Sequence, residues 1–213
     1  MENRIHTVIF DLDGTLSDSA VLTVAAFNNI LTAQGIPVPS LENIRMATGY
    51  SAPEFYYILF PNYPRGQILE IGRLVEQEES RMLPSIGDRV LFSGSRELLK
   101  YLYEHGIRLY IASTGARDHV FPILEETGII GFFDTISCGR PDKTEMLREL
   151  THDRNKTGYV MVGDMKKDHE SARANGIFSV GACYGYCRRE LTEFDSYIDT
   201  PLELLRVLNI REK

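Results

Sequence analysis

The sequence of 213 residues contains no tryptophan, only three cysteines and no apolar stretch that approaches the length of a transmembrane helix. The N-terminus also lacks an apolar signal segment. Cys138, Cys183 and Cys187 are odd in number, and no second pair of ligands lies near the last two, so a zinc site is not expected. These absences predict a protein with no membrane partner that carries reduced thiols in the cytoplasm.

Basic residues are also fewer than acidic ones. The chain has 23 Lys and Arg against 30 Asp and Glu, which gives a formal net charge of -7. A nucleic-acid binder needs a basic surface, so nucleic acid is not an expected partner. The length suits one α/β domain, or one core with a smaller insert, and either a monomer or a homodimer agrees with this composition.

Acidic residues interrupt an apolar run near the N-terminus, between Val8 and Asp18. Residues 7–10 are β-branched or aromatic and predict a strand that is buried on both faces of a parallel sheet. Asp11 and Asp13 follow its carboxyl end, where open α/β sheets bind their ligands.

Two carboxylates this close repel each other unless a cation or a proton lies between them. Mg²⁺ takes one or two carboxylates together with a substrate phosphate, so the pair indicates a magnesium site. A calcium loop of the helix-loop-helix type is excluded because it needs Gly at its sixth position, where Leu16 stands. The alternative is an ordinary loop with two solvated acids.

Helical patterns fill the chain from there to about Leu91, with hardly a strand signal, which predicts an inserted helical module. Asp18 or Ser19 can cap a first helix that ends before Gly35. Residues 51–54 fit a capping box that opens a second helix. A third, longer helix carries one apolar stripe, made of Ile68, Ile71, Val75 and Met82.

From residue 94 onward helices and strands alternate, which implies a parallel sheet. An amphipathic helix over 96–105 is followed by a strand over 107–112, and this strand leads into Ser113-Thr114-Gly115 before another helix. Hydroxyl groups and a glycine between a strand and a helix N-terminus are suited to binding phosphate. The alternative is that Ser113 is an ordinary helix cap.

Two further acidic residues follow the apolar strand predicted at 159–162. Asp164 and Asp168 lie four residues apart and share one face if a helix begins here, beside its positive N-terminus. Alternatively, Asp164 caps this helix and Asp168 lies on the surface. Lys143 directly precedes a helix predicted over 144–150. A cation at the N-terminus of a helix is repelled by the positive end of the helix dipole, so the lysine is expected to have another role.

Together these segments resemble the four ordered motifs of the haloacid dehalogenase superfamily, which here are Asp11-Leu-Asp13-Gly-Thr, Ser113 after a strand, Lys143, and Gly163-Asp164 with Asp168. The resemblance covers nearly the whole chain. It is strongest to the phosphoglycolate phosphatase-like members, which have a helical insert after the first motif. It implies a Rossmann-like α/β core at 1–15 and 91–213, with an α-helical cap domain at 16–90.

The third motif departs from the family pattern. Relatives often carry Lys directly before Pro, whereas here Arg140 precedes Pro141 and Lys143 follows. Lys143 is favoured because Lys-Thr-Glu-Met-Leu is similar to a variant in which the lysine opens the helix, and Arg140 is the other assignment. Met165 stands where Arg or Thr is frequent, and His169 where an apolar residue is usual, which leaves the specificity open.

The resemblance implies a Mg²⁺-dependent phosphatase that acts through an aspartyl-phosphate. Asp11 would be the nucleophile, and Asp13 would be the general acid and base. The metal would be held by Asp11, Asp164 and the backbone carbonyl of Asp13, with Asp168 behind them. The phosphoryl oxygens would be bound by Ser113, Thr114 and Lys143.

The presence of Asp13 indicates that the substrates are phosphate esters, because family members that displace halide lack this acid. A phosphohexose mutase is the alternative enzyme, and a binding module without turnover is the alternative outside enzymes. The ester itself stays open among phosphoglycolate, sugar phosphates, nucleoside monophosphates and pyrophosphate. The cap is expected to be a mobile lid with hinges near 16–18 and 85–87, and Gly49 is its best candidate for meeting the substrate.

Overall fold

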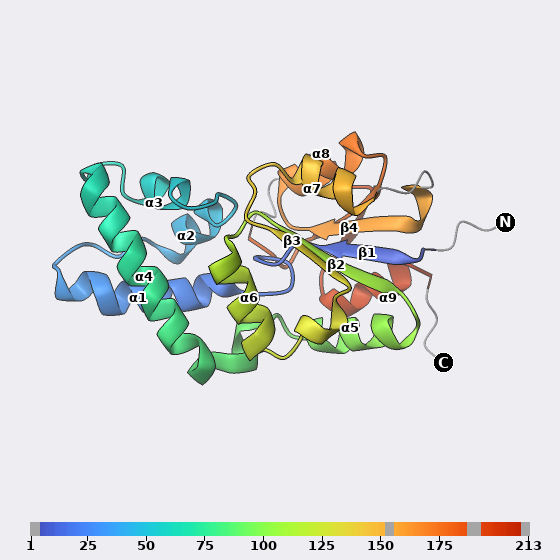
Figure 1. The fold of residues 1–213 in the computed structure, drawn as a ribbon, viewed down its shortest axis with the longest axis horizontal. Coiled ribbons are helices and arrows are strands. Elements are labelled where there is room, and N and C mark those ends of the chain that lie inside the picture. The colour runs from blue at the N-terminus through green and yellow to red at the C-terminus, as the bar shows by residue number, and fades with distance from the viewer. Residues whose placement is uncertain (1–4, 152–155, 187–192, 210–213) are drawn as a thin grey trace.

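The computed structural model describes residues 5–151, 156–186 and 193–209 and contains a six-stranded parallel sheet flanked by helices (Figure 1). The order of strands is β3-β2-β1-β4-β5-β6. The predicted α/β class is therefore confirmed. The strands are Thr7–Phe10 (β1), Arg108–Ser113 (β2), Thr135–Cys138 (β3), Tyr159–Gly163 (β4), Phe178–Ala182 (β5) and Ser196–Ile198 (β6).

Strand β1 lies at the centre of the sheet. All four of its residues are buried, and Phe10 lies opposite Ile111 of β2 on one side and Val162 of β4 on the other. Because β2 and β4 lie on opposite sides of β1, the order of strands reverses there. Open α/β sheets bind ligands at such a reversal, beyond the carboxyl ends of the strands. Asp11 leaves β1 at this position.

Helices cover both faces of the sheet. On one face α5, α6 and α9 pack against Val8 and Phe10, and on the other α7 and α8 pack against Ile9 and Met161. Successive residues of β1 thus face two hydrophobic layers, which explains its unbroken apolar run. These helices are Ser95–Glu104 (α5), Arg117–Glu126 (α6), Lys143–Leu150 (α7), Lys166–Ala174 (α8) and Leu204–Val207 (α9).

Four helices lie between β1 and α5 in sequence and carry a hydrophobic cluster of their own. Within it, the ring centre of Phe27 lies 6.4 Å from that of Tyr56 and 5.6 Å from that of Phe60. Leu22 and Leu83, near the two ends of this segment, pack with the sheet cluster instead. The cap boundaries at 16 and 90 stay a prediction. The four helices are Ser19–Ala33 (α1), Leu41–Ala47 (α2), Glu54–Leu59 (α3) and Arg65–Ile86 (α4).

The capping box predicted at Ser51 is wrong, and the cap predicted for the first helix is correct in position only. Helix α3 begins after Pro53, so Ser51 lies outside it and forms no capping box. Asp18 does precede α1, but its side chain caps no helix amide and instead pairs with Arg45 at 3.0 Å. In contrast, Gly35 has the positive φ of 66° expected of a residue that follows a helix.

None of the helices in the described ranges is long and apolar enough to cross a membrane. Cys138 ends β3 and Cys183 follows β5, whereas Cys187 lies outside the described residues.

Candidate active site

Three carboxylates converge at the carboxyl ends of β1 and β4. One oxygen atom from each of Asp11, Asp164 and Asp168 can be chosen so that all three lie within 4.8 Å of one another, and all three residues are buried. The two strands are neighbours in the sheet, which brings the residues after them together. Asp168 joins from the first turn of α8 and accepts a hydrogen bond from the Met165 amide at 3.0 Å.

Lys143 is the basic residue of this cluster. Its Nζ lies 2.7 Å from Asp11 Oδ1 and 2.5 Å from Asp168 Oδ1, and its side chain is buried. These ion pairs are the reason for a cation at the start of α7, where the helix dipole disfavours it. Arg140 instead pairs with Glu149 at 2.7 Å on the surface. The structure thus places Lys143, and not Arg140, beside Asp11.

The acidic cluster carries more negative than positive charge. Within the described residues, Lys143 is the only basic side chain within 4.0 Å of the three carboxylates. Burial raises the pKa of Asp11 to about 6, although Lys143 opposes the shift. Burial, then the charges of Asp11 and Asp168, raise the pKa of Asp164 well above its ordinary value.

The surroundings of the cluster fit a small divalent cation. Its ligand atoms are hard carboxylate oxygens, which Mg²⁺ prefers, and a cation would offset their repulsion. The backbone also comes close to these acids, since a Cβ atom at Gly14 would lie 2.3 Å from an oxygen of Asp164, and one at Gly163 would lie 2.3 Å from Asp168. The amide of Tyr186 donates to the same oxygen of Asp164, Oδ2, at 2.8 Å.

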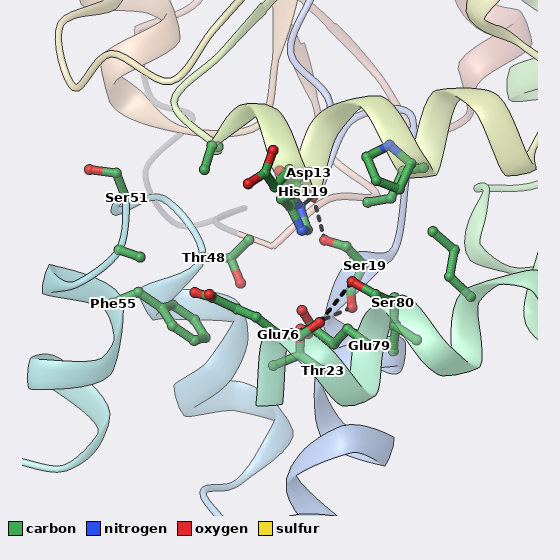
Figure 2. Close-up of a pocket in the computed structure, with 18 of the residues that line it drawn as sticks. Asp13, Ser19, Thr23, Thr48, Ser51, Phe55, Glu76, Glu79, Ser80 and His119 are labelled. Carbon is green, nitrogen blue, oxygen red and sulfur yellow. Dashed lines mark hydrogen bonds and ion pairs between the residues drawn. The ribbon is translucent and has the colours of Figure 1, made fainter. Parts of the chain in front are cut away.

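The Asp13 carboxyl group lies outside this cluster and has different partners. Its Oδ1 accepts hydrogen bonds from Ser19 Oγ at 2.5 Å and from His119 Nε2 at 2.9 Å (Figure 2). Burial alone would raise the pKa of Asp13, but the charge and hydrogen bond of His119 outweigh it and the pKa is lowered. Burial would lower the pKa of His119, but the charge of Asp13 raises it to about 9. The two therefore form an ion pair at neutral pH.

Ser113 is the last residue of β2, the strand next to β1 in the sheet, and Thr114 follows it. Ser113 Oγ accepts a hydrogen bond from the Gly115 amide at 3.0 Å. Thr114 Oγ1 lies 3.5 Å from the Gly49 carbonyl oxygen and 3.4 Å from Lys167 Nζ. The predicted phosphate-binding segment therefore contacts the loop that carries Gly49.

A cavity of about 420 Å³ opens beside Asp13. Helix α6 forms one wall and the helices of the insert form the other (Figure 2). Lining residues from the insert include Thr48, Ser51, Phe55 and Glu79. A group bound there would contact both parts of the chain.

Ser19, His119 and Lys167 lie in this region but were not predicted from the sequence as residues of the site. His119 meets Asp13 across 106 positions of sequence, so no local spacing connects them. Lys167 is the exception, since it lies inside the Gly163–Asp168 motif and a basic residue beside two acids is a usable signal.

With this geometry established, comparison with known proteins identifies the family. A family model described as haloacid dehalogenase-like hydrolase matches residues 8–182. The chain belongs to this family. A phosphoglycolate phosphatase from Pseudomonas savastanoi is 28% identical over 190 residues, covering 84% of this hydrolase and 70% of that protein. A tyrosine-protein kinase named PtkA from Mycobacterium bovis is 31% identical over 201 residues, covering 87% and 65% of the two chains.

Solved structures agree with the assignment. A haloacid dehalogenase-like hydrolase from Streptococcus pneumoniae superimposes with a TM-score of 0.80 at 25% identity, over 97% of this chain and 99% of that one. A predicted phosphoglycolate phosphatase from Haemophilus somnus has a TM-score of 0.78 at 19% identity, covering 97% and 99%, and shows the shared fold. These relatives place this hydrolase among the phosphatases of the family.

Proposed function

We propose that this hydrolase is a Mg²⁺-dependent phosphatase of small phosphate monoesters that works through an aspartyl-phosphate. The observation that carries the proposal is the arrangement of Asp11, Lys143, Asp164 and Asp168 at the carboxyl ends of β1 and β4, next to a cavity lined by Asp13. A nucleophile, a cation for the phosphate and a separate acid lie within one site.

In the first step a carboxylate oxygen of Asp11 would attack phosphorus, and the bond from phosphorus to the leaving oxygen would break. The Asp13–His119 pair holds one proton, and with that proton on Asp13 the carboxyl group would give it to the leaving oxygen and so release an alcohol. In the second step Asp13 would take a proton from water, whose oxygen attacks phosphorus. This restores Asp11 and frees inorganic phosphate.

Asp11, Asp164 and the backbone carbonyl of Asp13 would hold the metal, and Asp168 would support them. A bound Mg²⁺ would neutralise charge on the phosphoryl oxygens and lower the repulsion between phosphate and Asp11. Ser113, Thr114 and Lys143 would donate to the same oxygens. Lys143 already bridges Asp11 and Asp168, so it would keep the nucleophile in place while it binds phosphate.

The test is phosphate release from a panel of small phosphate esters, with phosphoglycolate included because the curated relatives are named for it. We expect activity with Mg²⁺, its loss with excess chelator and its return when Mg²⁺ is added back. Ca²⁺ should compete without supporting turnover, because it accepts more ligands and a looser geometry. Full activity in excess chelator would contradict the metal dependence.

The same panel separates the alternatives. A phosphohexose mutase would convert a sugar phosphate to its isomer with little phosphate release. A binding module without turnover would release none from any ester, including an aryl phosphate.

A further inference from the structure

The cavity beside Asp13 has a strongly acidic wall. Its lining includes three further carboxylates, from Glu76 and Glu79 of α4 and from Asp118 of α6. Figure 2 shows Glu76 and Glu79 across the cavity from Asp13 and His119. A group that enters the cavity therefore meets acid on both sides.

The basic side chains of the lining are already engaged. His119 Nε2 lies 2.9 Å from Asp13, with which it forms an ion pair. The guanidinium of Arg73 donates to Glu70 at 2.6 and 2.9 Å and to Gln77 at 3.0 Å, and its side chain is half exposed. Both cations are therefore already paired with a carboxylate of the chain.

The carboxylates of the lining, in contrast, still have oxygen atoms that can accept hydrogen bonds. Thr23 donates to Glu79 at 2.5 Å and Tyr56 hydrogen-bonds to Glu76, but neither glutamate forms an ion pair with a Lys or Arg among the residues that the structure describes. Both hydrogen bonds to Asp13 end on Oδ1, and no described residue donates to its Oδ2, although Asp13 is only 8% exposed. This oxygen, in a residue that lines the cavity, is an acceptor that a ligand can use.

Cations suited to phosphate lie elsewhere. Lys143 contacts Asp11, and Lys167 lies near Thr114, and neither lysine lines the cavity. The phosphate and the remainder of a substrate therefore meet environments of opposite charge, which fixes the direction in which an ester enters.

Building on the proposed phosphatase function, we propose that the cavity receives the leaving group of the ester and selects uncharged or cationic leaving groups against anionic ones. Like charges repel, and such repulsion is an effective source of specificity. Hydroxyl and ammonium groups can donate to the acidic wall, whereas a carboxylate cannot. Glu76 and Glu79 are the residues that set this preference.

The inference separates this hydrolase from the relatives named for phosphoglycolate, whose leaving group carries a carboxylate. It is tested with three esters of matched size, namely 2-aminoethyl phosphate, 2-hydroxyethyl phosphate and phosphoglycolate. Values of kcat/KM are measured with Mg²⁺ by phosphate release, alongside p-nitrophenyl phosphate, and each ester is also tested as an inhibitor of the aryl substrate. We expect kcat/KM for phosphoglycolate to be at least tenfold below both of the others.

The ratio of kcat/KM for 2-hydroxyethyl phosphate to kcat/KM for phosphoglycolate should fall about tenfold in the double variant Glu76→Gln with Glu79→Gln. The main cause should be a higher kcat/KM for phosphoglycolate. Glu78→Gln is the matched control, because Glu78 lies on the same helix but bonds to Asn29 at 2.7 Å and to Arg81 at 2.6 Å. It should leave the ratio unchanged.

The outcomes separate the two proposals. Charge selection is wrong if phosphoglycolate is the best substrate of the three esters. It is also wrong if none of the three is hydrolysed and phosphoglycolate is the best inhibitor of the aryl substrate. The proposed phosphatase function stands in either case. An unchanged ratio in the double variant overturns the roles of Glu76 and Glu79. If none of the esters, the aryl phosphate included, releases phosphate with Mg²⁺, the proposed function falls and this inference with it.

Discussion

Asp11 and Asp13 are separated by one residue, yet their carboxyl groups have different partners. Asp11 lies beside Lys143 and two other acids, and burial raises its pKa to about 6. Asp13 lies beside His119, which lowers its pKa. The two identical side chains therefore have separate surroundings, and the proton that the proposed reaction needs on Asp13 is the one that it shares with His119.

Replacing Asp11 by Asn should abolish turnover and leave the fold intact. The amide has nearly the same shape, but it is neither a nucleophile nor a good ligand for Mg²⁺. We expect kcat to fall by roughly three orders of magnitude or more, with a melting temperature within a few degrees of the wild type. Retention of more than about a tenth of the activity, a change worth only about 1.4 kcal/mol, would show that Asp11 is not the nucleophile.

His119 should act by positioning Asp13, since it holds the oxygen Oδ1 at 2.9 Å. His119→Ala should slow an alkyl phosphate by roughly a hundredfold, the lower end of what general acid catalysis contributes. An aryl phosphate with a nitrophenolate leaving group needs no protonation, so its first step, measured as a burst, should change far less. His119→Gln can still donate to Asp13 and should recover part of the loss. Equal losses for both substrates would argue for a general structural effect instead.

Among the elements, the central strand and the segments that follow it were predictable, whereas the edges of the sheet were not. Residues 7–10 and 159–162 are continuous apolar runs because both faces of the sheet bury them, and β1 and β4 occupy these positions. Strand β3 is short and half-exposed, and α2 has only seven residues, so neither has a clear period.

The contacts of the site also include some that the sequence indicated and some that it did not. The resemblance to the family indicated Lys143, and its burial against Asp11 agrees, but the roles of these residues stay predictions. The hydrogen bonds of Asp13 to Ser19 and His119 depend on how α1 and α6 pack, which local sequence does not encode. The capping box at Ser51 failed because the neighbouring Pro53 determines where α3 begins.

Helix α8 brings a second lysine to the phosphate side of the site. Lys167 is half-buried, its Nζ lies 3.4 Å from Thr114 Oγ1, and its ammonium lies 5.9 Å from the centre of the Tyr50 ring. Lys167→Gln should raise KM, and the inhibition constant of inorganic phosphate, about tenfold each, with a smaller effect on kcat, because a binding charge is lost while the reacting groups remain.

Lys166→Gln is the matched control for this prediction. Lys166 is the preceding residue of α8, is exposed and pairs with Glu170 at 3.3 Å. Its substitution should leave both constants unchanged. Equal effects of the two substitutions would mean that the lysines act only through the overall charge of the protein.

In the described part of the chain, two adjacent stretches connect the insert, which has its own hydrophobic cluster, to the sheet and the clusters on its two faces. The Asp18 amide donates to the Val90 carbonyl at 2.7 Å, and the Phe92 amide donates to the Leu16 carbonyl at 3.0 Å. The entry and exit of the insert therefore run side by side, close to the predicted hinges. Gly87, with a φ of 51°, ends α4 within the second of these hinges. Such a pair of connections allows one body to rotate against the other.

A lid that closes over Asp11 and Asp13 would limit the size of the substrate. An aspartyl-phosphate must form in a dry site and then admit one water, so the insert would have to close and reopen in each cycle. The Gly49 carbonyl oxygen lies 3.5 Å from Thr114 Oγ1, and a Cβ atom at Gly49 would overlap the sulfur of Met165, so this loop rests on the phosphate side of the core. A bulky ester would hold that loop away from the core.

We therefore expect kcat/KM to fall steeply along a series of phosphate esters of increasing size, with a phosphorylated protein at least about a hundredfold below 2-hydroxyethyl phosphate. Deleting the insert is a poor test, because Leu22 and Leu83 belong to the core cluster and their loss would disturb the sheet. The better measurement compares intact protein on both substrates, with an unrelated phosphatase of broad specificity confirming that the phosphoprotein can be cleaved. Similar rates on the small ester and the phosphoprotein would mean that the insert does not act as a lid.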